Sequence, residues 1–388
     1  MDNGPTLQEV CEEVVDCVNR TAPEDPRGEF YVIGTPAMRG NTINLREARR
    51  VTKDVFDRWT RRLLPRAGDL LLAREAPVGP VVRVPDGGNF AAGQRTTHLR
   101  ANPEKVDPRF LYYLLASSAV QQRILAGAMG STVPHLRVAD VKSLRLPLLP
   151  ALGTQRAVAD VLGALDDKIA ANERVVVVGE QLVQELVGRV GDRVALEELA
   201  TRSKQSTKPD PAEQVNHFSL PAFDDGQSPS SERGEDIKSS KFLLNSPCVL
   251  MSKLNPRISR VWNVSELPEG TCIASTEFVV LVPQVVSTHA LWATLTHPRV
   301  RDELMGRVAG TSGSHQRVKP EEILALDVTD VRSLSDTSRD QVDAVGALGH
   351  QLRVESRTLA QTRDQLLPLL MSGKVTIKEA ENEIADLV

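Results

Sequence analysis

The most regular pattern of apolar positions lies between residues 154 and 190. Apolar side chains recur there at steps that alternate between four and three residues, with Asn172 and Gly179 as the exceptions. Such steps form the seam of a two-helix coiled coil. Residues 345–369 repeat the alternation near the C-terminus. One such stretch is equally typical of an amphipathic helix on an ordinary core, but two favour a pair of long antiparallel helices that act as a spacer.

The rest of the chain reads as mixed α and β. Short apolar runs bounded by turn formers predict buried strands at 30–38 and 69–73. Residues 80–90 predict a hairpin around a Pro-Asp-Gly-Gly turn, and 108–125 predict a helix with one apolar side. The second half contains similar runs, and its polar stretch at 224–240, rich in Ser and Gly, predicts a loop.

The two halves share motifs in the same order, which predicts an internal duplication. Residues 128–144 resemble residues 308–324, and the same alignment sets Tyr112 opposite Trp292. The matched positions in this motif are Gly130 with Gly310, His135 with His315, Arg137 with Arg317 and Val138 with Val318. Further matches join 156–165 to 339–348 and 6–10 to 195–199. The repeat unit is therefore a globular segment followed by a long helix.

These patterns together predict the fold class and the domain boundaries. We expect an α+β protein with two similar mixed α/β domains, separated by two long antiparallel coiled-coil helices and related by a pseudo-two-fold axis. The predicted boundaries are 1–150 for the first domain, 151–191 for the first spacer helix, 192–333 for the second domain, 334–372 for the second spacer helix and 373–388 for a C-terminal tail.

Composition narrows the class of protein. With 388 residues, 41% hydrophobic and 25% charged, the chain is typical of a soluble protein of two or three domains. No apolar run has the length of a membrane span, and the acidic N-terminus does not resemble a signal peptide. The cysteines show no CxxC pair, which predicts free thiols in the cytoplasm. A net charge of −4 means that any nucleic-acid binding must come from local patches.

Three motifs resemble those of the specificity subunit of Type I restriction-modification systems. They are GDLLLAREAPVG at 68–79, GSTVPHLRVADVKSLRLPLLP at 130–150 and QRAVADVLGALDDKI at 155–169, and diverged copies follow in the second half. The second copy departs from the pattern, because Gly313 and Ser314 replace the proline of the loop and LDVTDVRSL replaces the prolyl stretch.

The resemblance implies a role in DNA recognition. Its two target-recognition domains would each read one half of a split double-stranded DNA target, asymmetric here because the domains differ outside the motifs. Its helices would hold the domains apart and carry methyltransferase subunits, expected to number two, and restriction subunits would join through the complex. The chain itself would be non-catalytic, and S-adenosylmethionine would belong to the methyltransferase.

The expected helix length suits this role. At roughly 1.5 Å per residue, each helix spans on the order of 50 Å. Half-sites one turn of DNA apart lie about 34–36 Å from centre to centre, and paired domains read such half-sites in equivalent ways. The helices are therefore long enough to set the spacing between half-sites.

Candidate DNA contacts in the first domain fall in three places. The basic run from Arg39 to Arg62, which includes Arg49 and Arg50, would neutralise phosphates or simply form a solvated face. Arg74, expected on a loop after a strand, would read a guanine edge or else pair with Glu75 or another carboxylate. The polar run of Gln94, Arg95 and Thr97 would read bases or form a plain surface strand.

The second domain offers a loop that corresponds to the Arg74 loop. Its candidates are Lys253, Asn255, Arg257 and Arg260. His135 and His315 recur in loops before a helix, where a structural hydrogen bond or a phosphate contact fits better than catalysis.

Motifs of catalysis are missing from the sequence. It contains no Gly-rich cofactor loop after a strand, no GxxxxGK[ST], no HExxH and no Asn-Pro-Pro-aromatic motif of an adenine methyltransferase. We therefore predict no catalytic residue, no metal ligand and no cofactor in this chain. Two alternatives stay open: a protein-binding scaffold without direct DNA readout, and a nuclease with an unrecognised site.

Overall fold

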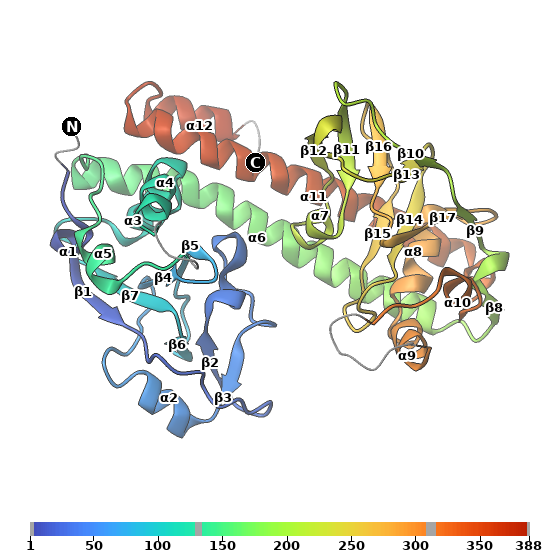
Figure 1. Cartoon of the computed structure of the whole chain (residues 1–388), viewed down its shortest axis with the longest axis horizontal. Coiled ribbons are helices and arrows are strands. Elements are labelled where there is room, and N and C mark those ends of the chain that lie inside the picture. Colours follow the sequence, from blue (N-terminus) through green and yellow to red (C-terminus); the bar gives the residue numbers. More distant parts are fainter. Residues whose placement is uncertain (1–3, 129–133, 308–315, 386–388) are drawn as a thin grey trace. The chain divides into compact units, whose positions relative to one another are not determined.

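The computed structural model describes residues 4–128, 134–307 and 316–385 (Figure 1). The chain forms two compact units. The first unit contains residues 1–168 together with 359–388, and the second contains residues 169–358. Each unit has two principal β-sheets with helices packed against them, so the predicted mixed α/β content is confirmed.

The main sheet of the first unit is antiparallel and has the strand order β1-β7-β4-β5. Its central strand β4 is buried along its whole length, because helices α3 and α4 cover the sheet and a second sheet lies beside it. The elements are α1 (Leu7–Val10), β1 (Cys11–Asp16), β4 (Leu70–Arg74), β5 (Val78–Arg83), β7 (Thr96–Ala101), α3 (Pro108–Ala116), α4 (Ser118–Gly127) and α5 (Val138–Ser143).

The second sheet of the first unit has the order β3-β2-β6, with β2 and β6 parallel. Its elements are β2 (Phe30–Ile33), η1 (Thr35–Asn41), β3 (Arg49–Val51), α2 (Lys53–Trp59) and β6 (Phe90–Ala92). The predicted hairpin at 80–90 is wrong, because β5 pairs with β4 while β6 pairs with β2. The Pro-Asp-Gly-Gly segment instead carries the chain from one sheet to the other.

The second unit repeats this arrangement with its own strands. Its main sheet, read as β9-β17-β14-β15, has the same order and the same antiparallel pairings. These elements are η2 (Leu196–Glu198), β9 (Ala200–Ser203), β14 (Cys248–Ser252), β15 (Val261–Val264), β17 (Phe278–Pro283), α8 (Thr288–Thr296), α9 (Pro298–Gly306) and α10 (Pro320–Leu324). A two-stranded sheet pairs β8 (Arg193–Ala195) with β18 (Asp327–Thr329), which η4 (Val331–Ser333) follows.

The second sheet of the second unit is larger than its counterpart. It has the order β10-β13-β16-β11-β12, with β11 and β16 parallel as β2 and β6 are. Its elements are β10 (Ser206–Thr207), β11 (Gln214–Phe218), α7 (Leu220–Asp224), β12 (Ser230–Arg233), η3 (Gly234–Asp236), β13 (Lys241–Leu244) and β16 (Thr271–Ala274). The loop expected at 224–240 therefore contains strand β12. This strand has a polar sequence because it is an edge strand with one exposed face.

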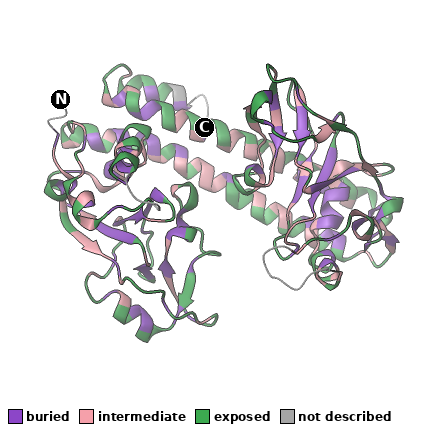
Figure 2. Ribbon diagram, in the orientation of Figure 1, coloured by how far each residue is buried: buried purple, intermediate pink, exposed green. Residues whose placement is uncertain are grey.

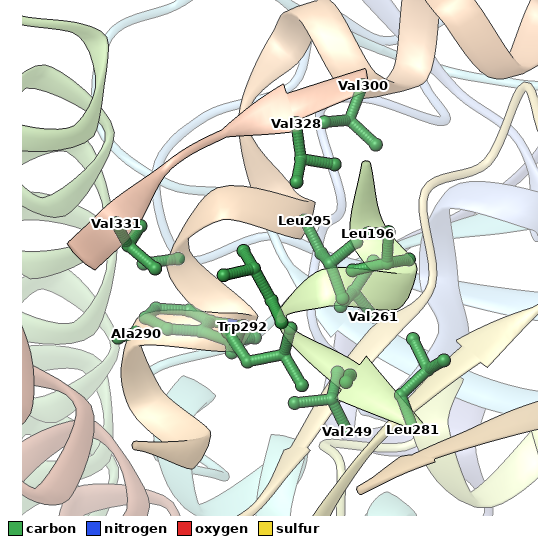
Figure 3. Packing of buried hydrophobic residues seen from close by; sticks show 14 of the residues in the cluster. Leu196, Val249, Val261, Leu281, Ala290, Trp292, Leu295, Val300, Val328 and Val331 are labelled. Atoms are coloured by element: carbon green, nitrogen blue, oxygen red, sulfur yellow. The ribbon is translucent and has the colours of Figure 1, made fainter. Parts of the chain in front are cut away.

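The core of the second unit lies between its main sheet and the helices. Leu196, Val249 and Leu281 from the sheet side meet Trp292 and Leu295 of α8, as Figure 3 shows. All five side chains are buried. Figure 2 shows buried residues gathered on the strands of both units. Burial of such side chains is the main source of stability in each unit.

Two long helices run through both units. Helix α6 (Leu152–Gly188) has 37 residues and α11 (Asp336–Met371) has 36. In the second unit, Asn172 Nδ2 donates to Glu355 Oε2 at 2.8 Å, and Arg353 pairs with Glu180 at 2.6 Å. Residue numbers thus rise along one helix as they fall along the other, so the helices are antiparallel there.

Both exceptions in the apolar seam have a local reason. Asn172 is 4% exposed, and its amide is used by Glu355 and by Ser356 across the seam. A Cβ atom on Gly179 would lie 2.9 Å from Val345, so the helices approach too closely there for a larger residue. In the first unit, Arg363 of α11 pairs with Asp166 of α6 at 2.6 Å.

The segment expected as a C-terminal tail contains a helix, α12 (Ile377–Ala385). Thr376 and Glu379 form a capping box at its start, with bonds of 2.8 Å and 3.2 Å. Ala380 is fully buried, so the helix packs on its unit.

Backbone contacts correct the register of the sequence match. Leu136 N donates to Arg74 O at 2.9 Å, and in the second unit Val318 N donates to Lys253 O at 3.0 Å. The next residues, Arg137 and Lys319, are the N-caps of α5 and α10. Arg137 therefore corresponds to Lys319 and not to Arg317, which corresponds to His135.

The motif match before this point keeps its predicted register. Tyr112 and Trp292 occupy the same position in α3 and α8. Between these helices and the N-caps of α5 and α10, the offset between the two halves grows by two residues. Gly130, Gly310 and His315 lie outside the described residues, so their predicted roles stay predictions.

Candidate nucleic-acid interface

The basic run of the first unit lies on η1, β3 and α2. Arg49 in β3 pairs with Glu24 at 3.1 Å, and Arg50 Nε donates to Gly28 O at 2.8 Å. These two guanidiniums are therefore partly engaged within the unit. Arg39 in η1 is exposed.

Three arginines of this run keep their charge unpaired. Within residues 4–128, 134–307 and 316–385, the side chains of Arg39, Arg46 and Arg61 make no ion pair and no hydrogen bond, and all three residues are exposed. Lys53, by contrast, pairs with Asp57 at 2.7 Å. Free, exposed cations of this kind are the side chains that neutralise phosphates.

Arg74 lies inside strand β4 and not on a loop, which corrects the prediction. It is 6% exposed, and it donates to Asp16 Oδ1 at 2.6 Å and to Leu136 O at 3.0 Å. A buried guanidinium requires such partners, because burying an unpaired charge is costly. The structure thus agrees with the alternative of a salt bridge to another carboxylate.

The polar run Gln94, Arg95 and Thr97 divides between surface and interior. Gln94 accepts a hydrogen bond from Thr21 at 3.0 Å, and Arg95 is 43% exposed at its side chain. Thr97 lies fully buried in β7, which removes it as a surface contact. Its side chain points into the sheet packing because alternate residues of a strand face opposite sides.

A group of charged side chains lies at the end of β4, and we call it the first cluster. It consists of Asp16, Arg74, Glu75, Arg95 and His135. Glu75 forms an ion pair with Arg95 at 3.3 Å, and His135 Nδ1 lies 3.4 Å from Glu75 Oε2, beside the Arg74–Asp16 pair. The backbone N–H of Arg74 donates to Arg95 O at 2.8 Å, and Glu75 and His135 form an isolated β-bridge. The cluster therefore joins the ends of two strands to the residues before α5.

The equivalent place in the second unit carries what we call the second cluster. It consists of Lys253, Asn255, Glu277, Gln316 and Arg317. Arg317 pairs with Glu277 at 2.8 Å, and Asn255 N donates to Gln316 O at 2.9 Å. Burial lowers the pKa of Lys253, with the Glu277 carboxylate acting in the opposite direction. Lys253 therefore lies near both the Glu277 carboxylate and the Arg317 guanidinium.

Two other predicted residues of this loop differ from each other. Arg260 donates two hydrogen bonds to Asp224, at 2.7 Å and 2.8 Å, and its side chain is only 12% exposed. Because its guanidinium is engaged by the Asp224 carboxylate, Arg260 holds the loop in place and is not free for a ligand. Arg257 is exposed and has no ion pair within the described part of the chain.

Several buried polar atoms of the clusters lack a hydrogen-bond partner among the described residues. In the second cluster they are Asn255 Oδ1, Glu277 Oε2 and Gln316 Oε1, and in the first cluster the atom is Arg74 Nε. Buried polar atoms in proteins are nearly always paired with protein or with water. Three of these four atoms lie in the second cluster, which marks it in particular as a candidate binding surface.

One polar group that the sequence analysis missed lies in the main sheet of the first unit. Asp69 accepts from His98 at 2.7 Å and from Arg100 at 2.7 Å, and all three are buried or nearly so. Burial opposes ionisation of Asp69, but the hydrogen bonds from His98 and Arg100 outweigh it and lower the pKa to about 2. The sequence signal that could have revealed this group is the spacing of His98 and Arg100, which lie two residues apart on strand β7 and so face the same side. The group stabilises the sheet and does not reach the surface.

Two general features bear on the class of protein. No helix in the described ranges is long and apolar enough to cross a membrane. Over the same ranges, no group of three or more His, Cys, Asp or Glu side chains has an arrangement that could hold a metal ion.

Comparison with known proteins finds one family model and several relatives that are similar to parts of the chain. Residues 6–176 match the family model described as the Type I restriction modification DNA specificity domain. A chain of Mycoplasma genitalium named as a type I specificity subunit is 35% identical over 82 residues, which are 21% of each chain. A protein of Mycoplasma pneumoniae with the same description is 30% identical over 104 residues, or 27% of each chain. These matches span only about a quarter of the relatives' length.

The fold match extends over nearly the whole chain. The crystal structure of a Type I restriction-modification system S subunit from M. genitalium covers 95% of this chain and 95% of its own, with a TM-score of 0.53 and 15% identity. At this identity the match concerns the fold alone. Through residues 6–176, the chain is similar to the family of Type I restriction-modification DNA specificity domains.

Proposed function

We propose that this chain recognises a bipartite, asymmetric target in double-stranded DNA, with one half read by each unit. The observation that carries the proposal is the recurrence of one sheet order in both units, with a charged cluster at the same strand ends. A duplicated reader whose copies carry different side chains would bind two unlike half-sites in equivalent ways.

The charges support separate roles in DNA binding. Arg39, Arg46 and Arg61 of the first unit and Arg257 of the second are exposed and unpaired within the described residues, which suits phosphate contact. Arg49 and Arg50 add to the positive surface of the first unit. Base contacts would come from Arg95 in the first cluster and the adjacent Gln94, and from Lys253 and Asn255 in the second cluster.

The long helices would dock the methyltransferase. In the second unit they carry exposed apolar side chains, which on a helix otherwise charged favour a protein partner. These are Val175, Val177, Val178 and Leu182 on α6, and Leu348 and Val354 on α11. A cavity of about 360 Å³ between these helices, lined in part by Gly179, Gly346 and Gly349, lies in the same region.

The partner subunits would perform the chemistry in the cytoplasm. Two methyltransferase subunits, each binding S-adenosylmethionine, would match the two units, and restriction subunits would join through that complex. The helices, at about 55 Å for 37 residues, would set the distance between half-sites.

Binding to duplex DNA as a function of salt tests the proposal. We expect the logarithm of affinity to fall linearly with the logarithm of salt concentration, with a slope that reports several phosphate contacts. Replacing Arg39, Arg46 and Arg61 by alanine should reduce the slope by about one per lost contact. Arg301, paired with Asp302 at 3.8 Å, provides a control substitution.

The alternatives give different results in the same experiment. A scaffold would bind the methyltransferase but would show no salt-dependent affinity for DNA. A nuclease would cleave DNA when the purified chain alone is given a divalent metal. Either result would overturn the proposed function.

A further inference from the structure

The two clusters occupy the same backbone positions with different side chains. The register set by the hydrogen bonds of Arg74 and Lys253 makes three pairs equivalent. These pairs are Arg74 with Lys253, Arg95 with Glu277 and His135 with Arg317. The isolated bridges of Glu75 with His135 and of Leu254 with Arg317 add a fourth pair, Glu75 with Leu254.

Within this shared frame, the carboxylate and the guanidinium come from different positions in the two units. In the first unit the carboxylate follows β4, as Glu75, and holds Arg95 at 3.3 Å. In the second unit Leu254 stands at that position and cannot hold a cation. The carboxylate comes instead from Glu277, at the position of Arg95, and holds Arg317 at 2.8 Å.

In both units the carboxylate is the inner partner and the guanidinium the outer one. The side chains of Glu75 and Glu277 are 28% and 27% exposed, whereas those of Arg95 and Arg317 are 43% and 62% exposed. A guanidinium has five donors in a planar fork, and one carboxylate uses only part of them. Each arginine therefore has donors that its carboxylate partner leaves unused.

This arrangement fits a base edge better than a phosphate. The pair carries no net charge, and the carboxylate repels a phosphate, so it contributes little to charge neutralisation. Holding the fork in place is what bidentate contact with guanine O6 and N7 requires.

We propose that Arg317, held by Glu277, reads a guanine in the half-site of the second unit, and that Arg95, held by Glu75, does so in the first. The inference rests on the proposed function and names the side chains that determine specificity. Because the two forks start from different positions on one frame, they reach different places in the two half-sites. This difference in position thereby makes the target asymmetric.

Selection from a pool of DNA duplexes with a randomised segment tests this, with the full chain as the binding protein. The wild type should select a two-part sequence. Arg317→Ala should lose the preference for one guanine in one half by about 5- to 150-fold, while the other half and the salt dependence stay unchanged. Arg332→Ala removes the same charge from a pair with Asp330 at 2.8 Å in the same unit, and should select as the wild type does.

Two conservative variants separate orientation from charge. Arg317→Lys keeps the charge but lacks the fork, so it should lose the guanine preference and keep the salt dependence. Glu277→Gln should weaken the guanine preference. If Arg317 instead bound a phosphate, Glu277→Gln would remove a repulsion and strengthen binding to all sequences.

The outcomes distinguish this inference from the function on which it rests. A wild-type chain that selects no sequence would overturn the proposed function. A wild-type chain that selects a two-part sequence, with Arg317→Ala and Arg317→Lys retaining every base preference, would overturn the inference alone. A uniform loss of affinity across sequences in Arg317→Ala would do the same, because it identifies a phosphate contact.

Discussion

Asp69→Asn should destabilise the first unit selectively. The carboxylate of Asp69 is shared by His98 and Arg100 at 2.7 Å each, and Asp69 is 5% exposed. The amide has nearly the same shape but no charge. Arg100, whose side chain is 11% exposed, would lose its counter-ion in the sheet interior.

The magnitude follows from the pKa of Asp69. Burial alone would raise this pKa, but the hydrogen bonds from His98 and Arg100 lower it from 3.8 to about 2. At about 1.4 kcal/mol per pKa unit, the ionised carboxylate contributes about 2 kcal/mol to the free energy of unfolding. Leaving Arg100 unpaired raises the total loss to about 3–5 kcal/mol at neutral pH.

The sign of the pH dependence is fixed by the lowered pKa. The contribution is fully present above the pKa of the unfolded chain and is lost as pH falls from about 5 toward 2. The wild type should therefore lose stability in this unit over that window, whereas Asp69→Asn should show little of this loss.

Hydrogen exchange of peptides from β4 and β7 measures the effect. Strands β14 and β17 serve as an internal control, because Val280 and Val282 occupy the positions of His98 and Arg100 there. Asp86→Asn, a change in an exposed loop, should leave exchange unaltered. Equal protection of β4 and β7 in Asp69→Asn and the wild type would refute the reasoning.

Three further predictions concern the helices and the modular reading of DNA. Gly346→Ala should lower the Tm of the second unit, because the new Cβ would lie 2.4 Å from His289 Nδ1. We expect this overlap to cost about 1–3 kcal/mol of stability. Gly349→Ala is the control: its Cβ would meet only the flexible end of Arg353 at 3.3 Å, so this change should be neutral or stabilising. Inserting one heptad into both α6 and α11 should lengthen the gap between half-sites in a mapped methylome, and an unchanged gap would exclude the helices as the spacer. Exchanging residues 1–150 for those of a relative should change one half of the DNA target. Retention of the whole target would contradict the hypothesis that each unit recognises its own half.

Local pattern was enough to predict the helices. The alternation of four and three residues involves only positions within one or two turns of the same helix. It can therefore be recognised without knowing which helix packs against it. Asn172 and Gly179 look like defects in the sequence, and both have reasons that only the facing helix supplies, namely Glu355 and Val345.

Elsewhere the sequence-based predictions were wrong where the structure depends on pairing between residues far apart in the chain. The apolar run at 80–90 predicts two strands correctly, but nothing local tells that β5 and β6 join different sheets. Arg74 reads as a loop residue because it follows an apolar run, yet it is the last residue of β4, and Asp16, distant in sequence, neutralises it. The match of Arg137 with Arg317 failed because the second half has two more residues than the first between α8 and the N-cap of α10, and the motif itself gives no sign of this shift.

The division of the chain has a consequence for how it is made. The second unit is one uninterrupted segment, residues 169–358, whereas the first requires both the start of the chain and residues 359–388. On the ribosome, the second unit can therefore complete its fold before the earlier-synthesised first unit acquires its last helices. A chain truncated after Thr358 would therefore contain every residue of the second unit but only part of the first.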